Sequence, residues 1–218
     1  MRGSFVTFCG GEGAGKSTMA SRLHNFFIEH DISCIFTKEP GGTGIGIDIR
    51  KILLSPENQN LDPKAELFLY LADRAQHFRE VIFPSIQSGN IVVSDRFIDS
   101  TFVYQGIARG LSKKFIEYAH DYIFEDFLPD LTIIFDIPPE VGLNRVGKDM
   151  SKGIRNEDES RFDLESLKFH ESVRQGFLSL ASKDNKKRFF VVDSSKRPDE
   201  IFEEIIRELS RRGIIKNI

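Results

Sequence analysis

Five short apolar runs recur along the chain, and each is rich in Val, Ile and Phe. Such near-continuous runs are typical of strands that are buried on both faces of a parallel sheet. The runs predict strands at residues 4–9, 32–37, 90–95, 131–137 and 188–193.

Amphipathic helical patterns lie between these runs. After the first run, apolar residues return at helical spacing at Met19, Leu23 and Phe27. The segment 198–212 begins with Pro and two acids and ends with two arginines before a glycine, which matches the charges to the helix dipole. The alternation predicts an α/β fold over residues 1–218, a single domain with a doubly wound five-stranded parallel sheet and helices on both faces.

One polar break interrupts this alternation, at residues 147–160, "GKDMSKGIRNEDES". It is rich in glycine and charge and stands between two predicted helices. An interdomain linker is disfavoured, because the helix that follows must still lead into the last strand of the same sheet. We therefore expect a short mobile lid here.

The stretch "GGEGAGKST" connects the first predicted strand to the first predicted helix. It matches the phosphate-loop pattern, in which glycines let backbone N–H groups converge on a β-phosphate at a helix N-terminus. Lys16 would bridge the β- and γ-phosphates, and the Ser17 hydroxyl would hold Mg²⁺. The residues expected to bind a nucleoside triphosphate, ATP or GTP, are Gly10, Gly11, Glu12, Gly13, Ala14, Gly15, Lys16, Ser17 and Thr18.

Other classes of phosphate-loop protein need motifs that this sequence does not have. A GTPase would carry Asn-Lys-x-Asp, but the only Asn-Lys pair, at 185–186, continues with Lys187 and Arg188. A motor or DNA-handling ATPase usually has paired acids at a strand end, whereas Asp95 is followed at once by Arg96. A basic residue in that position indicates a second anion beside the nucleotide, such as an acceptor phosphate.

Further basic and polar residues follow the second and third predicted strands. Arg50 lies after a glycine-rich turn, and Tyr70 and Arg74 share a helix face on which they could stack a base and hold its 5′-phosphate. Gln105 can present a donor and an acceptor to a base edge, which suits a pyrimidine N3–H/O4 pair. These residues predict a nucleotide-like acceptor without naming its base.

In the motifs "GGEGAGKST", "EPGGT", "LADRAQH" and "DRFIDSTFVYQG", and in their order, the chain resembles the thymidylate kinase family of phosphate-loop nucleoside monophosphate kinases. The resemblance spans nearly the whole chain. It implies a phosphoryl transfer from ATP to dTMP that gives dTDP and ADP for dTTP synthesis, with Mg²⁺ as cofactor.

The resemblance also implies a role for individual residues. Glu12 would contact the deoxyribose 3′-hydroxyl or nearby waters, and Asp95 with Arg96 would organise the metal and hold the acceptor phosphate. Arg74 would bind that phosphate while Tyr70 stacks on thymine. The implied dTMP-binding residues are Glu12, Glu39, Pro40, Arg50, Tyr70, Arg74, Arg96, Ser100, Thr101, Tyr104 and Gln105. The catalytic set is Lys16, Asp95, Arg96, Glu12 and Arg155, and the metal set is Ser17 with Asp95 through water.

Members of the family place an arginine in the phosphate loop or in the lid to stabilise transition-state charge. Because Gly13 follows Glu12, the arginine should come from the lid. The candidates are Arg155 first, then Arg145 and Arg161, with Lys148 and Lys152 as supporting charge. The chain departs from the family pattern in having Cys9 where an acid is common, Tyr70 where Phe is usual, and few lid arginines.

Composition limits the partners. The net charge of −3, from 30 basic and 33 acidic residues, gives no global basic excess for nucleic acid, and the apolar runs are too short to span a membrane. Cys9 and Cys34 lie in predicted buried strands, which with the absence of a signal-like N-terminus favours a cytoplasmic protein with reduced thiols. The resemblance implies a homodimer, and the surface around Phe68, Leu71 and Phe102 could serve it or belong to the core.

Two other functions stay open at this stage. One is a related kinase that acts on dUMP or another pyrimidine nucleotide. The other is a nucleotide-binding switch or regulatory ATPase, which Arg50, Arg74 and Arg96 disfavour because a switch has no acceptor phosphate to hold.

Overall fold

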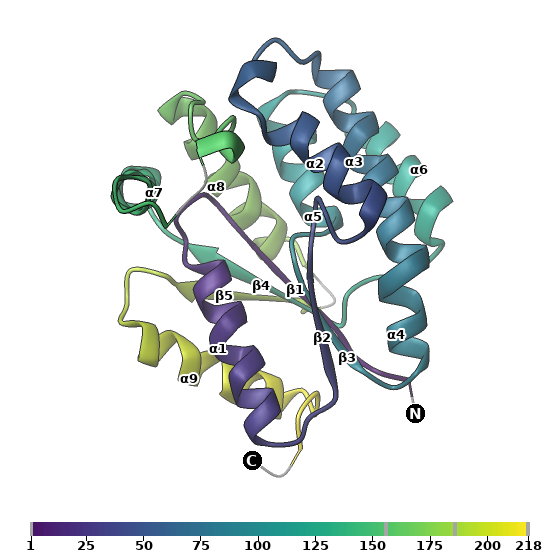
Figure 1. The fold of residues 1–218 in the computed structure, drawn as a ribbon. Helices are drawn as coiled ribbons and strands as arrows, with labels where there is room; N and C mark the ends of the chain where they lie inside the picture. Colours follow the sequence, from purple (N-terminus) through teal and green to yellow (C-terminus); the bar gives the residue numbers. More distant parts are fainter. Residues whose placement is uncertain (1, 155–156, 185–186, 217–218) are drawn as a thin grey trace.

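The computed structural model describes residues 2–154, 157–184 and 187–216. Within these ranges one sheet of five parallel strands has the order β2-β3-β1-β4-β5 (Figure 1). The strands are β1 (Phe5–Gly10), β2 (Cys34–Lys38), β3 (Ile91–Asp95), β4 (Leu131–Asp136) and β5 (Phe189–Asp193). The predicted five-stranded parallel sheet is confirmed, with strand ends shifted by one or two residues.

Helices connect the strands, as the alternating pattern predicts. They are α1 (Lys16–Glu29), α2 (Gly44–Leu54), α3 (Pro63–His77), α4 (Phe83–Gln87), α5 (Ile98–Thr101), α6 (Lys113–Phe124), α7 (Pro139–Ser151), α8 (Leu167–Ser182) and α9 (Pro198–Arg211). Short π-helical turns at 78–82 and 102–108 continue α3 and α5, and 3₁₀ turns lie at 56–58 and 157–159. In this part of the chain, none of the helices combines the length and the apolar character that a membrane span requires.

Each face of the sheet is covered by its own set of helices, which explains why the strands read as continuous apolar runs. In β1, Val6 and Phe8 join the cluster formed with α1 and α9, while Cys9 joins a cluster with α8 on the opposite face (Figure 1). Of the two cysteines predicted to be buried, Cys9 is fully buried but Cys34 only half-buried, because β2 lies at the edge of the sheet.

The strand order brings three segments that are distant in sequence to one edge of the sheet. In the parallel register, Phe8 of β1 and Lys38 of β2 both pair with Asp95 at the end of β3. The phosphate loop after β1, the turn after β2 and the residue after β3 therefore meet where ligands bind in doubly wound sheets.

The predicted lid lies between α7 and α8 for most of its length. Because α7 continues to Ser151, the first residues of the 147–160 segment are helical. Residues 155 and 156 lie outside the described residues. The phosphate loop packs closely against α7, since a Cβ added to Gly13 would lie 2.1 Å from the carbonyl oxygen of Gly142.

Candidate active site

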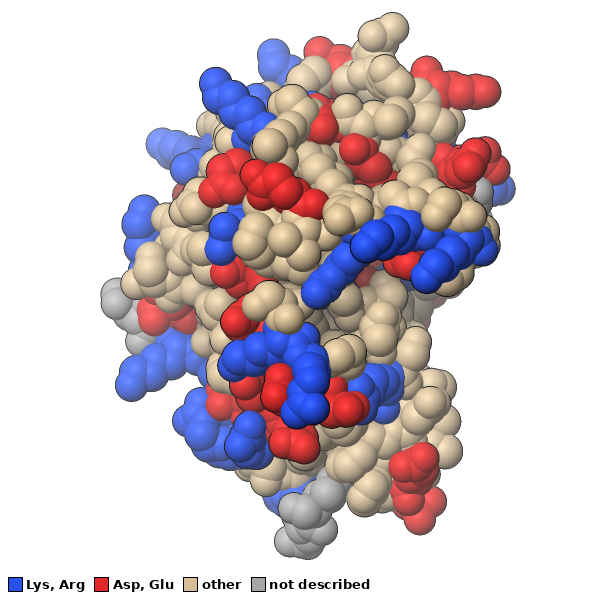
Figure 2. All heavy atoms as spheres, turned by 90° about the vertical axis from the view of Figure 1, so that its left-hand side faces the viewer, with Lys and Arg blue, Asp and Glu red and all other residues tan. Residues whose placement is uncertain are grey.

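A cleft of about 780 Å³ opens at the carboxyl edge of the sheet. Strands β1, β4 and β5 end toward the left of Figure 1, and the view of Figure 2 onto that side shows basic and acidic side chains intermixed. The residues that the sequence predicts and that line the cleft are Glu12, Gly13, Ala14, Gly15, Lys16, Ser17, Thr18, Glu39, Pro40, Arg50, Tyr70, Arg74, Asp95, Arg96, Ser100, Thr101, Tyr104, Gln105 and Arg145. Gly10 and Gly11 instead line a cavity of about 20 Å³ behind the phosphate loop.

The phosphate loop leaves the start of α1 open toward the cleft. Gly15, with a left-handed backbone at φ 85°, stands at the N-cap of α1 and has no side chain to cap the first N–H groups of the helix. Lys16 donates hydrogen bonds from Nζ to the carbonyl oxygens of Gly10 at 3.1 Å and Gly11 at 2.8 Å, so its amine lies across the loop. Burial, with Arg96 nearby, lowers the pKa of Lys16 to about 8. The helix N-terminus and this ammonium form an anion-binding cradle.

Ser17 and Asp95 form the corner of the cleft that suits a divalent cation. The Ser17 hydroxyl lies 3.4 Å from Oδ2 of Asp95, and the other oxygen of Asp95 is buried with no hydrogen-bond partner among the described residues. Within those residues, no group of three or more His, Cys, Asp or Glu side chains could hold a metal. The pair of Ser17 and Asp95 fits Mg²⁺, which takes one or two protein ligands and completes its shell with phosphate oxygens and water.

Glu12 is held by two cleft residues. Arg96 donates from Nη2 to Oε1 of Glu12 at 2.9 Å, and the Tyr104 hydroxyl lies 2.9 and 3.1 Å from the two carboxylate oxygens. Burial raises the pKa of Glu12, but Arg96 and Lys16 outweigh burial and leave this pKa below its usual value. Glu12 is therefore an anion inside a cluster of cations, and it fixes the position of the Arg96 guanidinium.

The floor of the cleft is a buried chain of polar contacts that starts at Arg74. The guanidinium bonds Glu39 and the hydroxyl of Thr101, and the side chain is 1% exposed. His77 joins from the other side, with Nδ1 2.9 Å from Glu39 and Nε2 2.6 Å from the Thr37 hydroxyl. Arg74 and Thr101, which the resemblance treats as separate ligands, therefore act as one unit. His77 and Thr37 were not predicted.

Comparisons with known proteins point to one family. The family model described as thymidylate kinase matches residues 8–205. A thymidylate kinase of Desulforapulum autotrophicum is 48% identical over 95% of this chain and 91% of its own length. One of Carboxydothermus hydrogenoformans is 47% identical over 94% of this chain and 96% of its own length. Among solved structures, thymidylate kinase from Ehrlichia chaffeensis superposes with a TM-score of 0.74 at 30% identity, covering 96% of this chain and 100% of that one.

The chain belongs to the thymidylate kinase family. It is thus an ATP-dependent nucleoside monophosphate kinase that phosphorylates dTMP to dTDP for dTTP synthesis. The phosphate-loop kinase fold predicted from the motifs is confirmed by the same comparison.

The lid cations predicted for this thymidylate kinase family member fall in different places. Arg145 lines the cleft from α7, where Nη1 donates to the carbonyl oxygen of Ser194 at 3.1 Å. Lys148 and Lys152 are exposed, and Arg155 lies outside the described residues. The structure does not support Arg161 as the donor. Its side chain is 3% exposed, does not line the cleft, and pairs with Glu66 and the carbonyl oxygen of Leu53.

Arg50 links α2, at the wall of the cleft, to the segment before α8. Its guanidinium makes two bonds to the carboxylate of Glu159, at 2.8 and 2.7 Å, and donates to the carbonyl oxygen of Pro40 at 2.8 Å. This bidentate pair is a strong contact between α2 and the segment before α8. Glu159 was not predicted, because nothing local marks an acid as the partner of an arginine 109 positions away.

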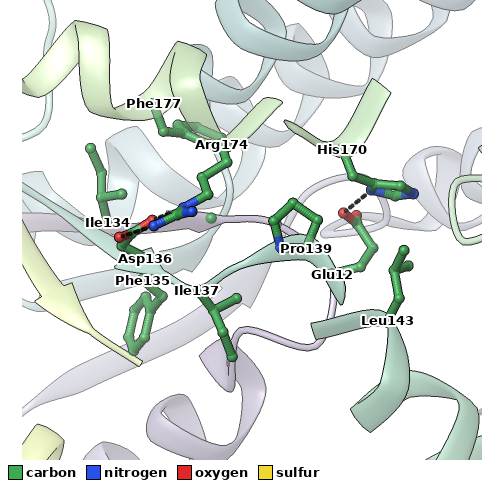
Figure 3. Close-up of a pocket in the computed structure, with 12 residues that line it drawn as sticks. Glu12, Ile134, Phe135, Asp136, Ile137, Pro139, Leu143, His170, Arg174 and Phe177 are labelled. Carbon is green, nitrogen blue, oxygen red and sulfur yellow. Dashed lines mark hydrogen bonds and ion pairs between the residues drawn. The ribbon is translucent and has the colours of Figure 1, made fainter. Parts of the chain in front are cut away.

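His170 is a second residue that sequence reasoning missed. It lies on α8 at the small cavity behind the phosphate loop, and Nδ1 is 3.7 Å from Oε2 of Glu12 (Figure 3). Arg174, one turn along α8, forms an ion pair with Asp136 at 2.7 Å in the same view. On the sequence, His170 reads as an ordinary residue of an amphipathic helix, and only the fold shows its proximity to Glu12.

The replacement of the family's common acid by Cys9 introduces no reactive group. The thiol is fully buried under the phosphate loop, 3.9 Å from the hydroxyl of Ser100. Burial raises the pKa of Cys9 to about 12, so the side chain is neutral and inert at physiological pH. Tyr70, another departure, lines the cleft with its ring 6.4 Å from that of Phe162.

Asp73 should make stability depend on pH in a direction opposite to most carboxylates. Its side chain is fully buried, Oδ1 accepts the N–H of Gly41 at 3.0 Å, and Oδ2 has no partner among the described residues. Burial, followed by the nearby Glu39 carboxylate, raises the pKa of Asp73 from 3.8 to about 6. The folded state binds this proton more tightly than the unfolded state. Burial of the ionised carboxylate therefore lowers the free energy of unfolding, fully above pH 6 and not at all below pH 3.8.

We expect Asp73→Asn, which keeps an oxygen for Gly41, to raise the free energy of unfolding by up to about 3 kcal/mol near neutral pH. The gain should shrink towards zero as the pH falls through 6 to 3.8. Urea denaturation of the parent and of Asp73→Asn at several pH values measures this difference in the free energy of unfolding. Asp48→Asn, at an exposed carboxylate, is the control. A gain that is the same at every pH would contradict the interpretation.

Proposed function

We propose that the cleft binds ATP and dTMP side by side and transfers the γ-phosphoryl group directly between them with Mg²⁺. The observation that carries this proposal is a second cationic site beside the phosphate loop. Arg74 and Arg96 line the same cleft as Lys16, and Nη1 of Arg96 is buried with no hydrogen-bond partner among the described residues. A phosphate accepted there would lie next to the triphosphate.

Each part of the cleft then has a chemical task. Lys16 and the open N-terminus of α1 hold the β- and γ-phosphates and stabilise the negative charge on their oxygens as the phosphoryl group is transferred. Arg96, positioned by Glu12, orients the acceptor phosphate for in-line attack. Ser17 and Asp95 would hold Mg²⁺, which when bound neutralises charge on the β- and γ-phosphate oxygens.

The nucleoside of dTMP would occupy the side of the cleft formed by α3 and the segment 98–108. Tyr70 offers its ring to the base, while Gln105 and Thr101 stand at the edge where a base would be read. Glu12 and Tyr104 lie between this region and the phosphate loop, where the sugar would pass. Ser100 and the Glu39–Pro40 turn complete the wall.

The transition state needs one more cation, which we assign to the lid. Arg155 stays our first candidate from the sequence. Arg145 is the described alternative, because it already lines the cleft. The pair between Arg50 and Glu159 would couple lid position to dTMP binding, since Arg50 lines the acceptor side of the cleft.

We also propose a homodimer, carried over from the family resemblance. Of the three residues considered, Phe68 is 57% exposed and packs on Phe115, Phe102 is half-buried, and Leu71 is buried in the core. Tyr118 and Tyr122 extend the exposed aromatic surface along α6. Light scattering with size-exclusion chromatography tests this, and a monomer at micromolar concentration would refute it. A cytoplasmic location stays a prediction, in keeping with two free cysteines.

The decisive assay follows ADP release with ATP and Mg²⁺ on dTMP, dUMP, dCMP, AMP and GMP, and once without an acceptor. We expect turnover largely confined to dTMP and lost when EDTA removes the metal. Equal turnover on another monophosphate would remove the base assignment. ADP release that ignores the acceptor would replace the kinase by a nucleotide hydrolase.

A further inference from the structure

Glu66 is a buried carboxylate to which the mechanism above assigns no task. It lies on α3, is fully buried, and meets three side chains from distant parts of the chain. Gln105 donates from Nε2 to Oε1 at 2.8 Å, and Arg109 donates to both oxygens at 3.3 and 3.2 Å. Arg161 makes an ion pair with Oε2 at 2.8 Å. Glu66 therefore joins α3, the segment after α5 and the segment before α8.

The chemistry of this cluster fixes which way the Gln105 amide faces. The carboxylate of Glu66 lies between two guanidinium groups, and its oxygens accept hydrogen bonds from the donors around it. The NH₂ end of Gln105 must therefore face Glu66, as observed. The reversed amide would set its oxygen against a carboxylate oxygen in a buried place, which loses a bond and adds repulsion.

The other edge of the amide belongs to the cleft. Gln105 lines the cleft, and within the described residues Oε1 accepts no hydrogen bond. With one N–H committed to Glu66, Oε1 and the second N–H form an acceptor–donor edge in a fixed order. Thymine and uracil match that order with N3–H beside O4. Cytosine shows the inverse, an acceptor N3 beside a donor amine, and would match only the reversed amide.

We propose that Glu66 is a positioning residue that locks Gln105 in the orientation that reads bases with N3–H, and so makes the site reject cytosine monophosphates. The proposal rests on the proposed function, because Gln105 reads a base only where the acceptor nucleotide binds in this cleft. Arg161 holds the other carboxylate oxygen of Glu66 in place from the segment before α8. Specificity thus depends on a residue that touches no substrate.

The test is the ratio of kcat/KM for dTMP to that for dCMP in Glu66→Gln. A neutral amide at position 66 can donate as well as accept, so Gln105 can turn. We expect the ratio to fall by about tenfold or more, with dCMP turnover rising relative to dTMP. The matched control is Arg109→Gln, which removes another partner of the same carboxylate but leaves its bond to Gln105, and it should keep the parent ratio.

A role in stability alone would lower both activities together and leave the ratio unchanged. If Glu66→Gln does not fold, Glu66→Gln combined with Arg109→Gln restores the net charge of the cluster and must show the same loss of discrimination. An unchanged ratio in a folded variant overturns the proposal. Gln105→Leu tests the base-reading role of Gln105 separately. If its dTMP/dCMP ratio falls while that of Glu66→Gln does not, Gln105 reads the base but Glu66 does not position it. A parent enzyme that accepts dCMP as well as dTMP would instead refute the proposed function itself.

Discussion

Replacing Lys16 by Met should lower kcat by about 1,000-fold or more while leaving the protein folded. Lys16 is the cation that the fold places across the phosphate loop, with Nζ bonded to the carbonyl oxygens of Gly10 and Gly11. A cation aimed at the transferring phosphoryl group acts mainly on charge that develops in the transition state, so its loss should reduce kcat more than ATP affinity.

The fold should tolerate this substitution because the buried ammonium is costly to keep. Burial lowers the pKa of Lys16 to about 8, which shows that the charged form loses solvation that its partners only partly restore. Met has a similar length and no charge, so the melting temperature of Lys16→Met should match or exceed that of the parent.

Single-turnover kinetics with saturating ATP and dTMP, together with thermal unfolding, measure both parts. Lys114→Met is the matched control, since Lys114 is exposed on α6 and away from the cleft. Its kcat should stay at the parent value. A loss in Lys16→Met of less than about tenfold would mean that other groups hold the γ-phosphate, and the role assigned to the loop would be wrong.

The sheet and the cleft could be predicted because their signals are local. A strand buried on both faces must read as an apolar run, and parallel order places every strand end at one edge. The phosphate loop, Asp95, Arg96 and Glu39 each lie at or just after the end of such a run, so their meeting follows once the strands are identified.

The side-chain pairings in and behind the cleft wall have no such local signal in the sequence. Glu66 meets Gln105 and Arg161, and Arg50 meets Glu159, across 39 to 109 positions of sequence. A charged residue on an amphipathic helix is usually solvated, so pattern alone favours the wrong environment for Glu66 and Arg161. Only the packing of α3 against the segments that follow α5 and precede α8 removes these groups from water.

The π-helical turn at 102–108 explains how Tyr104 and Gln105, both predicted at the site, reach two different partners. Val103, Tyr104, Gln105 and Gly106 are four consecutive buried positions, which a regular α-helix with one wet face does not accommodate. Widening the turn lets Tyr104 reach Glu12 while Gln105 reaches Glu66. A helical pattern read at 3.6 residues per turn would send one of the two towards solvent.

Replacing Arg96 by Met should lower kcat/KM for dTMP by about 100- to 1,000-fold and change the KM for ATP far less. Its guanidinium lines the cleft, Nη2 is bonded to Glu12 at 2.9 Å, and Nη1 is buried with no partner among the described residues. Removing it takes a strong donor from the acceptor phosphate and also leaves the Glu12 carboxylate without its main counter-charge. Arg207→Met, at an exposed position of α9, should behave as the parent.

A double-mutant cycle separates these two effects. Glu12→Gln alone should cost less than Arg96→Met, because the arginine remains to bind the phosphate. In the presence of Arg96→Met, Glu12→Gln should restore part of the lost kcat/KM, since it removes an anion that repels the incoming phosphate. Strictly additive losses would show that Glu12 does not act through Arg96. A rise in the KM for ATP that equals the rise for dTMP would place Arg96 on the donor side of the cleft instead.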